Sequence, residues 1–304
     1  MISVEHLSKR FKKTVAVNDL TFDVRPGVVT GFLGPNGSGK STTMRLLLGL
    51  DHPSSGHATV NGQRYRDLAQ PLHEVGALLD AKAVHPGRSA RQHLRALAAS
   101  NRISPGRVDE VLDITGITAV ADKKVGTFSM GMSQRLGIAA ALLGDPGVLL
   151  FDEPVNGLDP EGIRWIREFF RSLANEGRTV FVSSHLMSEM ALTAEQIIVI
   201  GRGRLITQGS VDDLTAGAKG VVYVRARDSD ALEAALKSQG ATFTAESQGF
   251  IVESLDAEAI GELALKAGIA LSSLTPQRAS LEEVFMDLTA GDVEYSAIKH
   301  GANS

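Results

Sequence analysis

The chain has 304 residues, of which 43% are hydrophobic and 22% are charged. This balance is typical of a folded globular protein, and the length allows about two domains. The formal net charge of −4 at pH 7 provides no basic footprint for non-specific nucleic-acid binding, so we expect no nucleic-acid partner. The absence of cysteine excludes disulfides and zinc–thiolate sites and favours a cytoplasmic setting.

The sequence offers no membrane segment. No apolar run approaches the roughly 18 residues that suggest a membrane-spanning helix. The N-terminal stretch MISVEHLSKRFKK is polar and lacks the apolar core of a signal peptide. We therefore expect the chain not to cross a membrane by itself.

A glycine-rich loop follows a strongly predicted strand. Alternating apolar residues at 20–24 and a Pro26-Gly27 turn lead into an apolar strand over 28–33. The residues GPNGSGKS at 34–41 have the G-x-x-x-x-G-K-S spacing of a phosphate-binding loop, and a helix follows them. In such a loop the backbone N–H groups surround phosphates, the lysine reaches the β- and γ-phosphates, and the hydroxyl contacts Mg²⁺. The predicted ATP and Mg²⁺ site contains Gly34, Asn36, Gly37, Ser38, Gly39, Lys40, Ser41 and Thr42.

Two segments of different character come after this loop. Asn61-Gly62 separates two strand-like stretches, which predicts a hairpin in an antiparallel β subdomain. From about residue 84 to residue 143 the pattern becomes helical, with prolines and glycines between the helices. We interpret this stretch as a helical lobe attached to an α/β domain.

Two buried strands carry polar residues at their carboxyl ends. GVLLF and TVFVS are continuous apolar runs with a helix between them, as expected of parallel strands covered on both faces. Asp152 and Glu153 follow the first run, and His185 follows the second. At this edge of an α/β sheet Asp152 would meet the Mg²⁺ shell and Glu153 would polarise the attacking water. Singly, these residues are also compatible with a solvated turn and a structural histidine, but together with the loop they indicate nucleoside triphosphate hydrolysis.

The stretch FSMGM at 128–132 precedes a predicted helix and has no use in a globular core. Ser129 and Gly131 give that helix a small polar start with a bare glycine. Farther along, Asp159 stands before Pro160, which is also the pattern of an ordinary helix start. What the FSMGM helix contacts is therefore the question that the function has to answer.

A second, smaller domain is predicted beyond a small polar stretch near residue 216. We place the first domain at 1–215 and the second at 216–290, with a loose tail at 291–304. The second domain reads as strand, helix, strand, strand, helix, strand, the order of ferredoxin-like α+β folds. A last amphipathic helix, ASLEEVFMDLT, follows this pattern.

The order of GPNGSGKS, FSMGMSQR, VLLFDEP, GLDP and SSH resembles the nucleotide-binding subunit of an ATP-binding cassette (ABC) transporter. The resemblance covers about residues 1–216. It implies that Ser129 and Gly131 face the γ-phosphate held by a second subunit, so that hydrolysis requires a dimer, here expected to be a homodimer. It also implies that Asp159 crosses this interface and that His185 contacts the γ-phosphate.

Other positions match this family less closely. Phe11 matches the position where the family stacks an aromatic ring on adenine, with an ordinary core or hairpin residue as the alternative. Phe128, Met130 and Met132 depart from the common Leu-Ser-Gly-Gly-Gln signature, in a form similar to the branch that exports drugs, antibiotics and polysaccharides. Asp80 stands where the family places a glutamine that contacts Mg²⁺, so we carry it as a candidate metal residue, with a solvated carboxylate as the alternative. SLEEVFMDLT resembles the C-terminal extension of the antibiotic-resistance branch.

The resemblance implies the ATP-hydrolysing subunit of an exporter of drug, antibiotic or other amphipathic substrate. Such a subunit drives a separate membrane-spanning permease from the inner face of the cell membrane. One alternative is a soluble cassette ATPase that remodels nucleic acid or the ribosome, although this chain has a single cassette and no coiled-coil insert. Another is a module in which ATP only switches the C-terminal domain. A simple P-loop kinase would leave FSMGM without a purpose.

Overall fold

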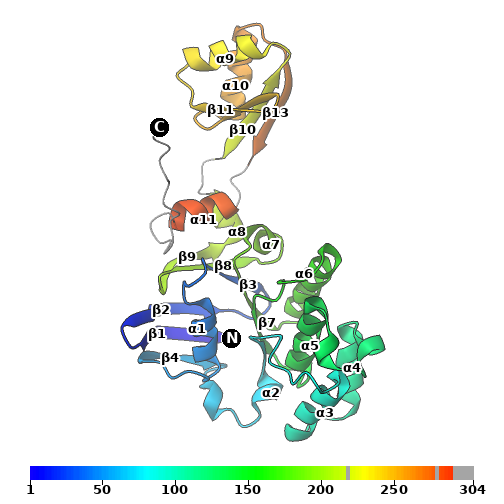
Figure 1. The fold of residues 1–304 in the computed structure, drawn as a ribbon. Helices are drawn as coiled ribbons and strands as arrows, with labels where there is room; N and C mark the ends of the chain where they lie inside the picture. The colour runs from blue at the N-terminus through cyan, green and yellow to red at the C-terminus, as the bar shows by residue number, and fades with distance from the viewer. Residues whose placement is uncertain (217–219, 278–280, 290–304) are drawn as a thin grey trace, which may run out of the picture. The chain divides into compact units, whose positions relative to one another are not determined.

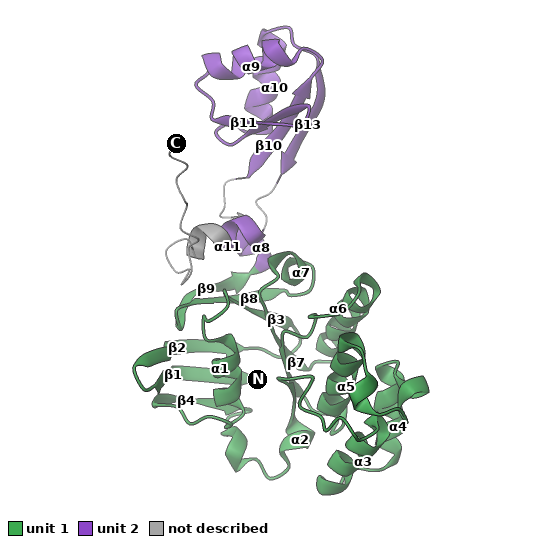
Figure 2. Ribbon diagram, in the orientation of Figure 1, with its two compact units in different colours: residues 1–210, 288–304 green, residues 211–287 purple. Residues whose placement is uncertain are grey.

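The computed structural model describes residues 1–216, 220–277 and 281–289. It divides into two compact units, the first formed by residues 1–210 together with the chain from residue 288 onward, and the second by residues 211–287 (Figures 1 and 2). The predicted boundary near residue 216 lies a few residues farther along the chain than this division. The predicted tail at 291–304 lies outside the described residues.

A six-stranded sheet forms the centre of the first unit, in the order β5-β6-β7-β3-β8-β9. All neighbouring strands are parallel except β8 and β9. The inner strands are continuous apolar runs because both faces of the sheet are covered. The strands are β3 (Val29–Leu33), β5 (Val75–Leu78), β6 (Val148–Asp152), β7 (Thr179–Ser184), β8 (Gln196–Gly201) and β9 (Arg204–Ser210).

A three-stranded antiparallel sheet lies beside it, as predicted, with β1 (Ile2–Phe11) between β2 (Thr14–Val24) and β4 (Ser55–Val60). The predicted hairpin at Asn61-Gly62 is wrong in its second strand. The turn forms, but only a single bridge from Val60 to Gln63 follows it, and the chain then enters a 3₁₀ helix over Tyr65–Asp67. The residues after the turn offer too few apolar side chains to give a strand a buried face.

Helix α1 (Lys40–Leu47) lies between the two sheets. The main core of the unit is built around it and includes the aromatic residues Phe22, Phe32 and Phe181. Their ring centroids lie 5.1 to 6.0 Å apart, in tilted arrangements. On another face, α6 (Pro160–Asn175) packs on β7 and β3. Each site-bearing strand is therefore fixed by helices on both sides.

The predicted helical lobe is present and consists of α3 (Ala90–Ser100), α4 (Gly106–Ile114) and α5 (Met130–Leu142) (Figure 1). Helix α3 starts at a capping box in which Ser89 and Gln92 satisfy each other's backbone N–H groups. Helix α5 packs closely on β5, and a side chain at Gly76 would overlap the carbonyl group of Ala141. This close approach fixes one side of the lobe against the central sheet.

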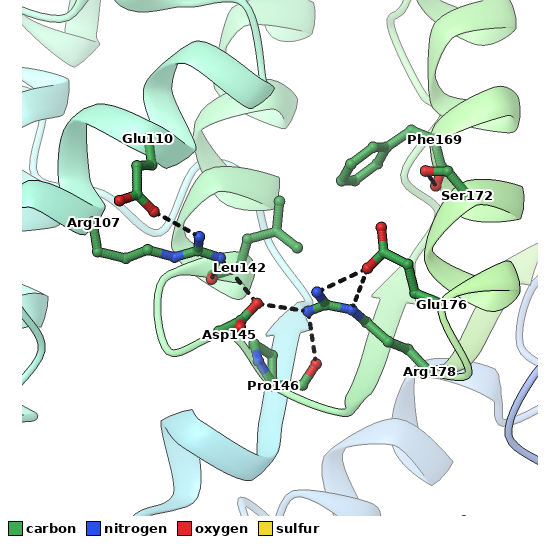
Figure 3. A network of polar contacts seen from close by, with 9 residues as sticks. All are labelled: Arg107, Glu110, Leu142, Asp145, Pro146, Phe169, Ser172, Glu176 and Arg178. Carbon is green, nitrogen blue, oxygen red and sulfur yellow. Dashed lines mark hydrogen bonds and ion pairs between the residues drawn. The ribbon is translucent and has the colours of Figure 1, made fainter.

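A polar network joins the other side of the lobe to the central sheet (Figure 3). Asp145, between α5 and β6, accepts hydrogen bonds from Arg107 of α4 at 3.1 Å and from Arg178, just before β7, at 2.9 Å. Both arginines also donate to backbone carbonyls, Arg107 to Leu142 and Arg178 to Pro146. Asp145 has a φ of 55°, in the left-handed region that aspartate tolerates better than most residues.

The second unit contains a four-stranded antiparallel sheet in the order β11-β12-β10-β13, with two helices on one face. Its own core includes Val224, Leu232, Phe250 and Ile260. The elements are α8 (Val211–Ala216), β10 (Val221–Ala226), α9 (Ser229–Ser238), β11 (Phe243–Glu246), β12 (Gly249–Val252), α10 (Ala257–Lys266) and β13 (Leu271–Gln277). The last helix, α11 (Leu281–Thr289), begins in this unit and ends in the first.

Candidate functional site

The glycine-rich loop connects the carboxyl end of β3 to the start of α1. It forms a pocket of about 220 Å³ with Ala16 and Glu153, and its lining includes every loop residue from 35 to 42. Two of its glycines are required by close packing, since a side chain at Gly34 would overlap Ser38, and one at Gly39 would overlap the Ala16 carbonyl. Gly39 also has a φ of 106°, which other residues rarely adopt. The loop is thus held in one conformation with its N–H groups at a helix start.

Lys40 lies under this loop and is only 6% exposed. Its ammonium group donates to the carbonyl oxygens of Gly34 at 2.6 Å and Pro35 at 3.3 Å. A carboxylate oxygen of Glu153 lies 3.7 Å away. Burial lowers the pKa of Lys40 from its usual range, and the charges of Glu153 and Asp152 partly oppose that effect. The Lys40 amino group is thus held within the loop by its two carbonyl groups and faces the Glu153 carboxylate.

The hydroxyl groups of the loop also indicate that this pocket binds a ligand. Ser38 is buried, and its hydroxyl has no hydrogen-bond partner among the described residues. An unpaired buried hydroxyl is unfavourable unless a ligand or water satisfies it. Ser41 and Thr42 follow in the first turn of α1 and line the same pocket. All eight predicted loop residues except Gly34 line the pocket directly, and Gly34 holds Lys40 through its carbonyl.

Glu153 stands at the carboxyl end of β6 in an unusual backbone conformation, with a φ of 50°. One oxygen of its carboxylate lies 2.8 Å from Nδ1 of His185, and the other is the oxygen that faces Lys40. Its backbone N–H donates to the carbonyl and the hydroxyl of Ser183. Asp152 accepts a hydrogen bond from the same Ser183 hydroxyl. The structure therefore brings together the predicted residues from three adjacent strand ends.

Ser183 was not among the predicted site residues, although it anchors both acidic residues. The sequence signal was present, because Ser183 and Ser184 end an apolar strand immediately before His185. A serine at the carboxyl end of a buried strand can donate or accept hydrogen bonds to acidic residues at the end of a neighbouring strand. Such a serine is therefore a candidate for anchoring them. Its buried position on β7 beside β6 could be recognised only once the strand order was known.

A second pocket, of about 570 Å³, is lined by Ser129, Gly131 and Met132 of the FSMGM stretch and shares no lining residue with the loop pocket. Ser129 caps α5 by accepting a hydrogen bond from the Met132 N–H, and Asp159 caps α6 by accepting one from the Gly162 N–H at 2.8 Å. Ser129, Gly131 and Asp159 all line this pocket. In one chain, these three predicted residues thus gather at a place separate from the loop.

The remaining two candidates lie outside both pockets. Phe11 ends β1 and is 45% exposed, with the ammonium of Lys9 4.8 Å from its ring centroid. Asp80 follows β5, is exposed, and accepts a hydrogen bond from the Lys82 N–H. Asp80 lines a different pocket, between the central sheet and the helical lobe. Neither side chain is placed beside the loop by the geometry of this chain alone.

The comparison with known proteins agrees with this geometry. Residues 17–156 match the ABC transporter family. A bacitracin transport ATP-binding protein, BcrA of Bacillus licheniformis, is 33% identical over 96% of this chain and 98% of its own length. The chain is an ABC transporter ATP-binding protein. ATP hydrolysis is therefore its activity.

Solved structures support the fold of this ABC protein. An ATP-binding subunit of an ABC transporter is 25% identical, with a TM-score of 0.65 over 72% of this chain and 95% of that one. A dimeric bacterial ABC transporter cassette, MJ0796, shares the fold with a TM-score of 0.64 and 23% identity over 69% of this chain and 99% of that one. Residues 220–282 match a domain of unknown function. Within the described residues no helix has the length and apolar character needed to span a bilayer.

Proposed function

We propose that this ABC protein powers the export of an antibiotic or another amphipathic compound by a separate membrane-spanning permease. The proposal is supported by the relative BcrA, whose name gives bacitracin transport and which aligns with this chain from end to end. Lantibiotic transport ATP-binding proteins of Streptococcus pyogenes also align with it. We further propose that the protein works at the cytoplasmic face of the membrane, bound to its permease.

The observation that carries the proposed mechanism is the position of the Glu153 carboxylate between Lys40 and His185. In this proposal Lys40 binds the β- and γ-phosphates, and the loop N–H groups hold the remaining phosphate oxygens. Glu153 accepts a proton from the attacking water, and His185 orients that carboxylate and contacts the γ-phosphate. General-base catalysis of this kind contributes about 10² to 10⁴ in rate.

Mg²⁺ is the cation expected beside the phosphates, and the residues present fit it. Mg²⁺ is usually bound by one or two carboxylates together with phosphate oxygens and waters, not by a cage of protein ligands. The described residues accordingly contain no cluster of three or more histidine, cysteine or acidic side chains able to hold a metal alone. Ser41 and Asp152 would supply the hydroxyl and the carboxylate. The bound ion would neutralise charge on the phosphate oxygens. We retain Asp80 as a candidate that would act through a metal-bound water.

The FSMGM pocket supports a site that two chains complete. Ser129 and Gly131 line this pocket at the start of α5, and the pocket shares no lining residue with the loop pocket. N–H groups at a helix start favour an anion. We propose that a second copy of the chain presents its loop-bound ATP to this pocket, with Asp159 at the contact. The dimeric cassette that shares this fold supports such an arrangement.

Two further assignments belong to this proposal. We assign Phe11, whose side chain is 45% exposed, to stacking on the adenine ring. We classify the second unit as a ferredoxin-like domain of the βαββαβ type, since its sheet order places the first and third strands side by side at the centre. Its role would be to support the dimer or to regulate the ATPase, because the residues proposed for hydrolysis all lie in the first unit.

The test is the ATPase activity per chain as a function of protein concentration, with a Ser129→Arg variant mixed into wild-type protein. If two chains complete each site, the activity per chain rises with concentration and the variant inhibits the mixture beyond simple dilution. Glu153→Gln in the same assay should nearly abolish turnover while ATP binding remains. Activity that is flat with concentration and insensitive to the added variant would refute the two-chain site.

A further inference from the structure

Gln134 connects the FSMGM helix to the turn that carries Glu153. It lies in the second turn of α5, and its side chain is only 4% exposed. Its amide nitrogen faces two backbone carbonyl oxygens, that of Glu153 at 3.5 Å and that of Asn156 at 3.4 Å. These two residues begin and end one tight turn, which the Asn156 N–H closes by donating to the Glu153 carbonyl. One buried amide group therefore spans the whole turn.

The other half of this amide shows that packing alone does not explain it. The Gln134 carbonyl oxygen is buried without a hydrogen-bond partner among the described residues. A buried unpaired oxygen is unfavourable, and an apolar side chain of the same length would avoid it. What glutamine supplies at this position is the pair of N–H donors. Both donors point at the turn in which Glu153 adopts its left-handed conformation.

The same helix also contacts the rest of this turn. A side chain at Gly157 would overlap Met130, and one at Gly131 would lie 3.3 Å from Leu158. Successive turns of α5 thus pack along the segment that runs from Glu153 to the start of α6. A change in the position of α5 is passed to the Glu153 backbone through these contacts.

We infer that Gln134 is a positioning residue for hydrolysis, which holds the Glu153 turn so that its carboxylate stays between Lys40 and His185. The inference rests on the proposed role of Glu153 as general base. It adds that the FSMGM helix serves its own chain as well as the proposed second chain, because it supports the base of its own nucleotide site. A small displacement of a catalytic group can cost about a hundredfold in rate.

The central variant is Gln134→Met, which keeps the length of the side chain and removes both donors and the unpaired oxygen. We expect kcat to fall about ten- to a hundredfold, with KM for ATP and the affinity for a non-hydrolysable ATP analogue changed less than about twofold. The thermal unfolding midpoint should stay near that of wild type. Ser133→Ala is the matched control, because Ser133 is equally buried in α5 but bonds only to the backbone of its own helix.

Gln134→Glu gives a second, independent readout. An ionised carboxylate has no donor and would face two carbonyl oxygens, so kcat should be low at neutral pH. Burial favours the protonated acid, which offers one O–H donor. The activity of this variant relative to wild type should therefore increase as the pH is lowered. A merely structural glutamine would not produce such a change in the pH profile.

The kinetic results of the two Gln134 variants either support the inference or overturn it. Lower kcat in Gln134→Met with unchanged nucleotide affinity, together with the pH response of Gln134→Glu, supports the inference. A normal kcat in folded Gln134→Met overturns it, and so does a Gln134→Glu variant whose activity relative to wild type does not change with pH. If Gln134→Met does not fold, the pH response alone decides. If wild-type protein fails to hydrolyse ATP, the proposed function fails instead, and the two failures are not confused.

Discussion

The network at Asp145 can be dissected by two substitutions that remove different parts of it. Asp145→Asn removes the charge that binds Arg107 and Arg178 but keeps a side chain suited to a φ of 55°. Asp145→Ala removes the charge and also places alanine in the left-handed region. Exposed ion pairs contribute about 0.2 to 1 kcal/mol each, and Asp145 is 61% exposed. The left-handed backbone costs other residues about 1 to 2 kcal/mol.

These values give an order and a size for the expected effects. Asp145→Asn should lower the free energy of unfolding by about 0.4 to 2 kcal/mol, the sum of two such pairs. Asp145→Ala should lower it by about 1 to 2 kcal/mol more. Raising the salt concentration to about 1 M shortens the screening length to about 3 Å, so the loss in Asp145→Asn should shrink. The difference between the two variants should persist, because backbone strain is not electrostatic.

Urea unfolding followed by tryptophan fluorescence suits this measurement. The single tryptophan of the chain, Trp165, lies in α6, so the signal reports on the first unit. The reasoning is refuted if Asp145→Asn is as destabilised as Asp145→Ala, since the backbone would then contribute nothing. It is also refuted if the loss in Asp145→Asn is the same at low and high salt.

Two other predictions use the same fluorescence assay. Burial, and secondarily the charge of Arg88, lower the pKa of His93 below its usual value near 6.5. The unfolded chain therefore binds a proton more readily than the folded one, so the stability that His93 contributes is present above about pH 6.5 and is lost as the pH falls through that value. The neutral variant His93→Gln should lose less stability on acidification than wild type. An identical pH dependence of the two proteins would contradict this cause. Gly76→Ala would place a methyl group against the Ala141 carbonyl, where strand and helix backbones meet, and should cost about 1 to 3 kcal/mol, whereas unchanged stability would show that β5 and α5 can separate freely.

The sequence predicted those parts of the site that local chemistry determines. The loop at 34–41, the polar ends of β6 and β7, and the helix cap at Asp159 are short motifs whose spacing requires one conformation. Continuous apolar runs also indicated parallel strands, which the sheet confirms. Each of these predictions rests on contacts between near neighbours in the chain or on a strict pattern of burial.

The predictions that failed and the site residues that were missed depend on contacts between residues far apart in the sequence. Asn61-Gly62 has strong hairpin chemistry, but a second strand needs a partner surface that the following residues do not provide. The hairpin that does form, between β1 and β2, turns at Lys12-Lys13 without glycine, because the long pairing of the two strands imposes the turn. Gln134 and Ser183 contact Glu153 across about 20 to 30 residues. No local pattern marks Gln134, and the polar strand end at Ser183 becomes informative only once β7 is known to lie beside β6.

Because Glu153 has a left-handed backbone, a selection experiment that rewards stability would act against ATP turnover. Glycine at this position would adopt the observed φ without strain, and relief of about 1 to 2 kcal/mol is a large share of the stability of a natural domain. A library ranked only by resistance to heat should therefore enrich the very substitution that removes the proposed base. Engineering of a more robust cassette has to exclude this codon from diversification, or score ATP turnover alongside survival.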